Sequence, residues 1–114
     1  MISNYENLVN ALNDILPAHY EMVLHSGMET PCISYMELTN IDDLTGDTRG
    51  YSRISYQVKV WSNDYEELLH YAAQIDKKVR PMGYRRVGSA ELYDNNSTMM
   101  QKVLTYQALG LEEY

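Results

Sequence analysis

Residues Gly50–Ser62, with the sequence GYSRISYQVKVWS, decide the fold of this 114-residue chain. Two sets of side chains alternate along them: Ile54, Tyr56, Val58 and Val60 on one side, and Arg53, Ser55, Gln57 and Lys59 on the other. A period of two is typical of a β-strand with one buried and one solvent-facing side. We therefore expect a long strand here, in a sheet with one covered face.

A helix is predicted directly after this strand, over Asp64–Val79. Its apolar residues recur at helical spacing and form the stripe Tyr65, Leu68, Leu69, Ala72, Ile75 and Val79. Asn63 is expected to cap the first turn, with Glu66 three residues later. Pro81 and Gly83 end the helix. The stripe predicts that this helix packs on the sheet.

The rest of the chain supplies another helix and four more strands. An amphipathic helix is expected over residues 4–16, capped by Ser3 and Glu6. The further strands are expected over Glu21–His25, Cys32–Leu38, Tyr84–Tyr93 and Met100–Leu109. Both faces of the Cys32–Leu38 strand are mixed, so its buried face stays open. The polar stretch Thr39–Arg49 has no period and indicates a long hairpin loop.

These elements follow one another in the order α-β-β-β-α-β-β. Because the strands are joined mostly by hairpins, we expect a mostly antiparallel sheet with both helices on one face. That arrangement is an α+β two-layer sandwich. At this length we expect a single domain over residues 1–114.

The composition excludes several classes of protein. A formal net charge of −7 argues against a protein that clamps nucleic acid through its phosphates. No apolar run approaches the roughly 18 residues of a membrane span, and the N-terminus lacks the features of a signal peptide. Cys32 is the single cysteine, so no intrachain disulfide is possible. We expect a soluble protein made in the cytoplasm.

Residues that could carry chemistry are not grouped in the sequence. His19, His25 and His70 have no spacing that pairs them as metal ligands. Cys32 has no neighbouring base and suits a small core residue. The acidic residues around Gly46 lack the order of an EF-hand, and no phosphate-binding loop occurs. We therefore expect no metal, no cofactor and no catalytic site, and a structural or binding protein rather than an enzyme.

Four segments occur in an order that carries a family resemblance: PCISY at 31–35, YQVKVWS at 56–62, YEELLHYAAQI at 65–75 and MGY at 82–84. Together with the leading helix and the acidic loop, they resemble the small tail-completion proteins of long-tailed bacteriophages, also called tail terminator or tail-to-head joining proteins. Cys32 stands where an aromatic residue is usual in that family.

This resemblance implies a structural virion protein without catalytic residues. Such proteins form rings, commonly hexameric, at the head-proximal end of the tail, where they end growth of the tail tube. The implied partners are further copies of the chain, the tail tube protein and a head connector or stopper protein. DNA only passes through the ring, no membrane is involved, and assembly takes place in the host cytoplasm.

Charge segregation gives candidate contact residues for such a ring. They are Asp42, Asp43, Asp47 and Arg49 in the loop, and the basic pair Arg85 and Arg86. An acidic loop that meets a basic pair on the neighbouring subunit would fix the register of the ring. The nearby Lys77, Lys78 and Arg80 are also explained by the negative end of their helix.

Two other roles remain open on the sequence alone. One is a head completion protein that binds and plugs the connector. The other is a small cytoplasmic binding or regulatory domain without a viral connection. An enzyme would need a pocket with perturbed titratable groups, and the sequence gives no sign of one.

Overall fold

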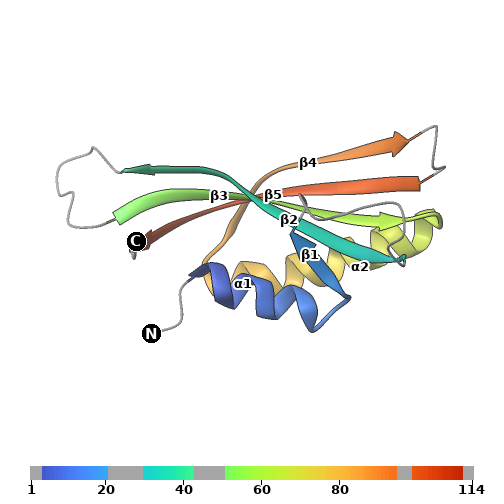
Figure 1. The fold of residues 1–114 in the computed structure, drawn as a ribbon, viewed down its shortest axis with the longest axis horizontal. Coiled ribbons are helices and arrows are strands. Elements are labelled where there is room, and N and C mark those ends of the chain that lie inside the picture. Colours follow the sequence, from blue (N-terminus) through green and yellow to red (C-terminus); the bar gives the residue numbers. More distant parts are fainter. Residues whose placement is uncertain (1–3, 21–29, 43–50, 95–98, 112–114) are drawn as a thin grey trace.

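The computed structural model describes residues 4–20, 30–42, 51–94 and 99–111 (Figure 1). The elements are α1 (Asn4–Asn13), β1 (Ala18–Tyr20), β2 (Cys32–Asp42), β3 (Tyr51–Ser62), α2 (Tyr65–Val79), the 3-10 turn η2 (Arg80–Met82), β4 (Arg85–Asp94) and β5 (Met99–Leu111). The predicted order α-β-β-β-α-β-β and the α+β class are confirmed.

The described strands form one sheet with the order β1-β2-β3-β5-β4. The β2–β3, β3–β5 and β4–β5 pairs are antiparallel, and β1–β2 is parallel. Both helices cover the same face of this sheet, below it in Figure 1. The prediction of a mostly antiparallel two-layer domain is therefore confirmed.

The core lies between that sheet face and the two helices. It consists of Leu8, Leu12, Ile33, Ile54, Tyr56, Val58, Val60, Leu68, Ala72, Ile75, Val79, Tyr84, Leu104 and Tyr106. All four residues of the predicted buried side of β3 belong to it. Burial of one large apolar side chain contributes about 1.5–3 kcal/mol, so this shared core holds the helices on the sheet.

The other side of β3 is less exposed than its alternation predicts. Ser55 is buried, and Gln57 and Lys59 are half-buried. The reason is that β3 is a central strand, so side chains of both neighbours flank it. Gln107 Nε2, on the neighbouring strand β5, donates a 3.4 Å hydrogen bond to Ser55 Oγ.

On β2, buried residues occur on both faces. Ile33 joins the core, while Cys32 and Ser34 on the opposite face are also buried. The indole nitrogen of Trp61 donates a 2.8 Å hydrogen bond to Ser34 Oγ, which satisfies that buried hydroxyl. Burial raises the pKa of the Cys32 thiol, as befits a small core residue.

The start of the sheet differs from the prediction. The predicted strand Glu21–His25 lies outside the described residues, and the observed β1 comes earlier, at Ala18–Tyr20. It runs parallel to β2, with Ala18 opposite Ile33. There the Ile33 amide donates a 2.9 Å hydrogen bond to the Pro17 carbonyl, and the Ala18 amide donates to Asn13 Oδ1 at 3.2 Å.

The start of α2 also differs from the prediction. Asp64, and not Asn63, is the N-cap, and its carboxylate accepts hydrogen bonds from the amides of Glu66 and Glu67. Ser62 also contacts the first turn of α2, where its hydroxyl donates a 2.9 Å hydrogen bond to Glu67 Oε1. The cap lies one residue later than predicted because Ser62 still belongs to β3 and Asn63 only connects the two elements.

Two residues of the predicted α2 stripe are not buried. Leu68, Ala72, Ile75 and Val79 face the core, while Tyr65 and Leu69 are 46% and 39% exposed. The helix therefore buries a narrower face than its apolar residues suggest. At its far end, Gly83 adopts φ 99°, a left-handed conformation that glycine reaches without strain. This residue turns the chain from η2 toward β4.

Several element ends lie away from the predicted positions. The helix α1 ends at Asn13 rather than at residue 16. The strand β2 continues to Asp42, so the first part of the expected loop pairs with β3, as Thr39 does with Ser55. The predicted caps at Ser3 and the rest of that loop, 43–49, lie outside the described residues. The hairpin strands β4 and β5 are confirmed, each with shifted ends.

Candidate subunit interface

The strand β4 forms one edge of the sheet and pairs only with β5 among the described strands. Its side chains from Arg85 through Tyr93 are all exposed. Three of them are large and apolar: Val87 and Leu92 are each 50% exposed, and Tyr93 is 58% exposed. An edge strand with exposed apolar side chains offers backbone hydrogen bonds and apolar area to another chain. It is therefore a candidate contact surface.

The two arginines at the start of β4 lie on opposite faces of the sheet. Arg85 pairs with Gln107, and Arg86 pairs with the core residue Tyr106. Because neighbouring residues of a strand alternate, only Arg86 points to the helix side. A β-bulge follows at once, between Arg86 and Gly88. The predicted basic pair is thus split between two surfaces.

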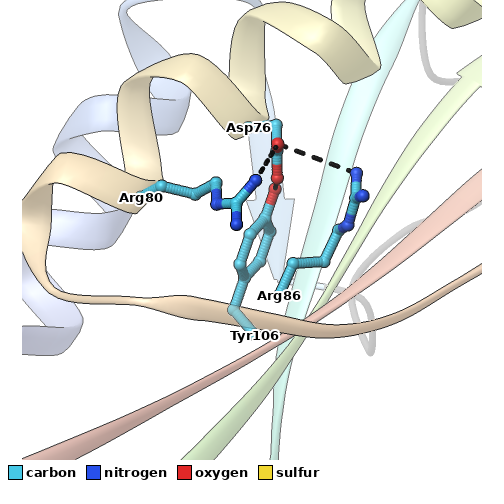
Figure 2. Close-up of polar contacts among 4 residues, drawn as sticks. All are labelled: Asp76, Arg80, Arg86 and Tyr106. Carbon is cyan, nitrogen blue, oxygen red and sulfur yellow. Dashed lines mark hydrogen bonds and ion pairs between the residues drawn. The ribbon is translucent and has the colours of Figure 1, made fainter.

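On the helix side, Arg86 belongs to a cluster around Asp76 of α2. Figure 2 shows the Asp76 carboxylate between the guanidinium groups of Arg80 and Arg86. The Nη1 atoms of Arg80 and Arg86 lie 3.3 and 3.7 Å from Asp76 Oδ2. The hydroxyl of Tyr106 donates a 2.9 Å hydrogen bond to Asp76 Oδ1. Burial, and then this bond to a carboxylate, raise the pKa of Tyr106.

This cluster forms one wall of an open groove of about 510 Å³ between α2 and the β4–β5 hairpin. Its floor is apolar and includes Leu69, Ala72 and Leu104. Four cationic side chains line it: Lys77, Arg80, Arg86 and Lys102. Asp76 is the single acidic residue of the lining. The groove is therefore positively charged, although the chain has a net charge of −7.

A second polar contact joins α2 to β4 and β5. Lys102 Nζ lies 3.1 Å from Glu91 Oε1, and the Tyr65 hydroxyl donates to the same carboxylate at 3.2 Å. The hydrogen bond from Lys102 holds the pKa of Glu91 below its usual value. The hydrogen bond to Glu91, together with the negative charge of that carboxylate, raises the pKa of Tyr65. The exposed position of Tyr65 on α2 is explained by this contact.

The predicted contact residues are placed only in part. Asp42 is the last residue of β2, where it pairs with Ser52. Asp43, Asp47 and Arg49 lie outside the described residues. The structure therefore does not test whether an acidic loop contacts a basic pair. It does add that Arg86 already has a partner in Asp76, whereas Arg85 makes no ion pair within the described part of the chain.

Three residues of this region were not predicted as part of a site: Asp76, Lys102 and Tyr106. The Asp76–Arg80 pair was detectable, because residues four apart share a helix face. The contacts of Asp76 with Arg86 and Tyr106 depend on tertiary packing, and no spacing in the sequence signals them.

The described residues also bear on metal binding and on membrane insertion. They contain no group of three or more His, Cys, Asp or Glu side chains that could hold a metal ion. Over the same ranges, no helix is both long and apolar enough to cross a membrane. The candidate surface is an edge strand with a charged groove beside it.

These features define a small two-layer α+β fold in which β4 forms a long edge of the described sheet. No protein family and no curated protein matches the sequence. Among solved structures, a chain from the "Virion of native gene transfer agent (GTA) particle" is similar, with a TM-score of 0.63 and 12% identity over 96% of this chain and 92% of that chain. At this identity the likeness shows a shared fold alone.

Proposed function

We propose that this chain is a structural protein of a phage-like virion, and that it caps the tail tube and joins the tail to the head as a ring. The strongest support is the fold shared, over nearly the whole of both chains, with a protein of the gene transfer agent virion. The open edge of β4 adds a surface suited to assembly, and the order of segments resembles the tail-completion proteins.

The two edges of the described sheet are unlike, and a ring needs contacts between two different surfaces of neighbouring copies. One edge is β1, a strand of three residues, and the other is β4, a strand of ten. If β4 contacts a different surface of its neighbour, the contact is head-to-tail, and such contacts close into rings when the rotation allows. Partners at the two ends of the ring would be the tail tube protein and the head connector or stopper.

The net charge of −7 suits a protein that surrounds DNA without holding it. Phosphate groups are repelled by carboxylates, so an acidic channel lets DNA slide. We place the protein at the head-proximal end of the tail. We propose no enzymatic activity for this chain.

Light scattering coupled to gel filtration tests the proposal. The purified chain is measured across a range of concentrations, alone, with tail tubes of the same particle and with its head connectors. A closed ring, or a monomer that joins the end of the tube, is the expected result. A chain that binds connectors but ignores tubes would instead be a head completion protein. A chain indifferent to both would contradict a role at the head–tail joint.

A further inference from the structure

We propose that the groove between α2 and β4 binds the acidic segment Asp42–Asp47 of a second copy of this chain. This deepens the proposed function, and rests on it for the assumption that copies assemble. The site consists of described residues only, namely the apolar floor and the cations on its walls. Of the proposed occupant, Asp42 alone lies within the described residues.

The charges of the groove exceed what the chain itself neutralises. Its lining carries Lys77, Arg80, Arg86 and Lys102 against Asp76, so 4 − 1 leaves a net charge of +3. Glu91 pairs with Lys102 from beside the groove and reduces the excess to +2. The segment Asp42–Asp47 carries three aspartates and no cation, so its charge is −3. The charges of site and segment are therefore opposite in sign.

The four cations of the groove differ in the ion pairs that they make within their own chain. Arg80 and Arg86 share one oxygen of Asp76, so a single carboxylate serves two guanidinium groups. Lys77 makes no ion pair with any described residue. A second carboxylate brought by a neighbour would therefore add favourable contacts without displacing existing ones.

The floor of the groove adds an apolar component. Leu69 belongs to the apolar stripe of α2, yet it is 39% exposed on the groove side. The acidic segment contains one leucine, Leu44, between Asp43 and Asp47. Burial of a leucine side chain adds a favourable contribution that does not rely on charge. An occupant that carries both carboxylates and a leucine matches the two kinds of surface in this groove.

We assign the segment to a neighbouring copy, because the proposed ring brings copies of the chain into contact. Within one copy, the base of the segment lies at the Ser52–Gly110 pair, and the apolar part of the groove lies at Leu104, six positions back along β5 (110 − 104). At about 3.4 Å per residue, these two positions are about 20 Å apart along the strand.

Binding of a labelled peptide to the full-length chain tests this inference directly. The probe is fluorescein-labelled peptide 39–49, measured by fluorescence anisotropy. Lys77→Glu is expected to weaken binding at least about fivefold, because reversal turns one attraction into a repulsion. Lys78→Glu is the matched control, since Lys78 lies next to it on α2 but pairs with Asp14 outside the groove. It should change binding less than about twofold.

A charge-swapped pair of peptide and chain distinguishes a lost contact from a misfolded variant. A peptide with Asp43→Lys and Asp47→Lys should bind the Lys77→Glu chain better than the wild-type chain. Equal weakening by Lys77→Glu and Lys78→Glu, or failure of the wild-type peptide to bind at about 1 mM, would overturn the groove assignment. Failure of the peptide in a chain that forms rings leaves the proposed function standing. Peptide binding by a chain that never assembles or joins a tube supports the groove and contradicts the function.

Discussion

The hydroxyl of Tyr106, on β5, donates a 2.9 Å hydrogen bond to the carboxylate of Asp76, on α2. Tyr106 is fully buried, so the bond joins the middle of the core to the wall of the groove (Figure 2). The same carboxylate carries the contacts with Arg80 and Arg86. One side chain of the core therefore fixes the geometry of the charged cluster on the surface.

Removal of this hydroxyl should destabilise the fold without creating a cavity. We expect Tyr106→Phe to lower the free energy of unfolding by about 1–2 kcal/mol, because a hydrogen bond to a charged acceptor is lost. Urea unfolding followed by circular dichroism measures this. Tyr93→Phe is the control, because Tyr93 is 58% exposed, and it should cost almost nothing. Equal costs for the two variants would contradict the role of the Tyr106–Asp76 bond.

Alkaline pH should destabilise the protein through Tyr84. Burial raises the pKa of Tyr84 to about 12, from 10.0 in an exposed tyrosine. The unfolded chain therefore loses this proton first, and stability that is complete below pH 10 falls as the pH rises toward 12. The loss should reach about 3 kcal/mol for this group alone.

Urea titrations at several values of pH, for wild type and Tyr84→Phe, check this expectation. The variant cannot ionise at this position, so its stability should fall less steeply above pH 10. Part of the slope should persist, because the pKa of Tyr106 is also raised. Parallel curves for the two proteins would show that Tyr84 ionises as readily folded as unfolded.

The N-cap of α2 gives a prediction that separates two neighbouring residues. Asp64 accepts hydrogen bonds from the amides of Glu66 at 3.0 Å and of Glu67 at 3.4 Å. Asp64→Ala should therefore lower the free energy of unfolding by about 0.5–2 kcal/mol. Asn63→Ala should change it by less than about 0.5 kcal/mol, as an exposed residue outside the cap. A larger loss of stability for Asn63→Ala than for Asp64→Ala would instead identify Asn63 as the N-cap, as the sequence predicts.

Two apolar residues of α2 should differ sharply in their effect on stability. Ile75 is fully buried, and Ile75→Ala should cost about 2–5 kcal/mol through lost contacts and a cavity. Leu69 is 39% exposed, and Leu69→Ala should cost less than about 1 kcal/mol. Thermal and urea unfolding of both variants measure the difference. Similar costs would mean that the groove side of α2 is packed like its core side.

The exposed apolar residues of β4 should matter for assembly rather than for folding. Leu92→Lys should leave the free energy of unfolding within about 0.5 kcal/mol of wild type, because the side chain is 50% exposed. The same variant should shift the mass measured by light scattering toward the monomer. Leu38→Lys on β2 is the matched control, since Leu38 is 43% exposed and lies away from β4. A loss of assembly in the control alone would move the interface to β2.

Long periodic segments could be predicted from the sequence. The short strand β1 and the choice between two neighbouring capping residues could not. The alternation of Ile54, Tyr56, Val58 and Val60 extends over seven residues, which is long enough to predict a strand, and all four side chains are buried. The three residues of β1 are too few to show a period. Its pairing depends on the contact between Pro17 and Ile33, which are far apart in the sequence.

The cap and the charged cluster illustrate the same limit. Asn63 and Asp64 are both good capping residues, and the choice depends on where β3 ends. Arg86 is predicted as half of a basic pair, yet the alternation along β4 separates it from Arg85 and packing brings it to Asp76. Charge patterns in the sequence identified the region but not the contacts within it.

The bulge between Arg86 and Gly88 bears on how this protein behaves at high concentration. Amyloid-type fibrils require flat strands that stack without end, each adding to the exposed edge of the last. A bulge bends and twists its strand, so β4 presents regular backbone pairing only from Gly88 to Asp94. Such an edge accommodates one neighbour in a defined position but is a poor template for indefinite growth. Concentrated samples should therefore contain discrete particles of fixed mass and bind no thioflavin T.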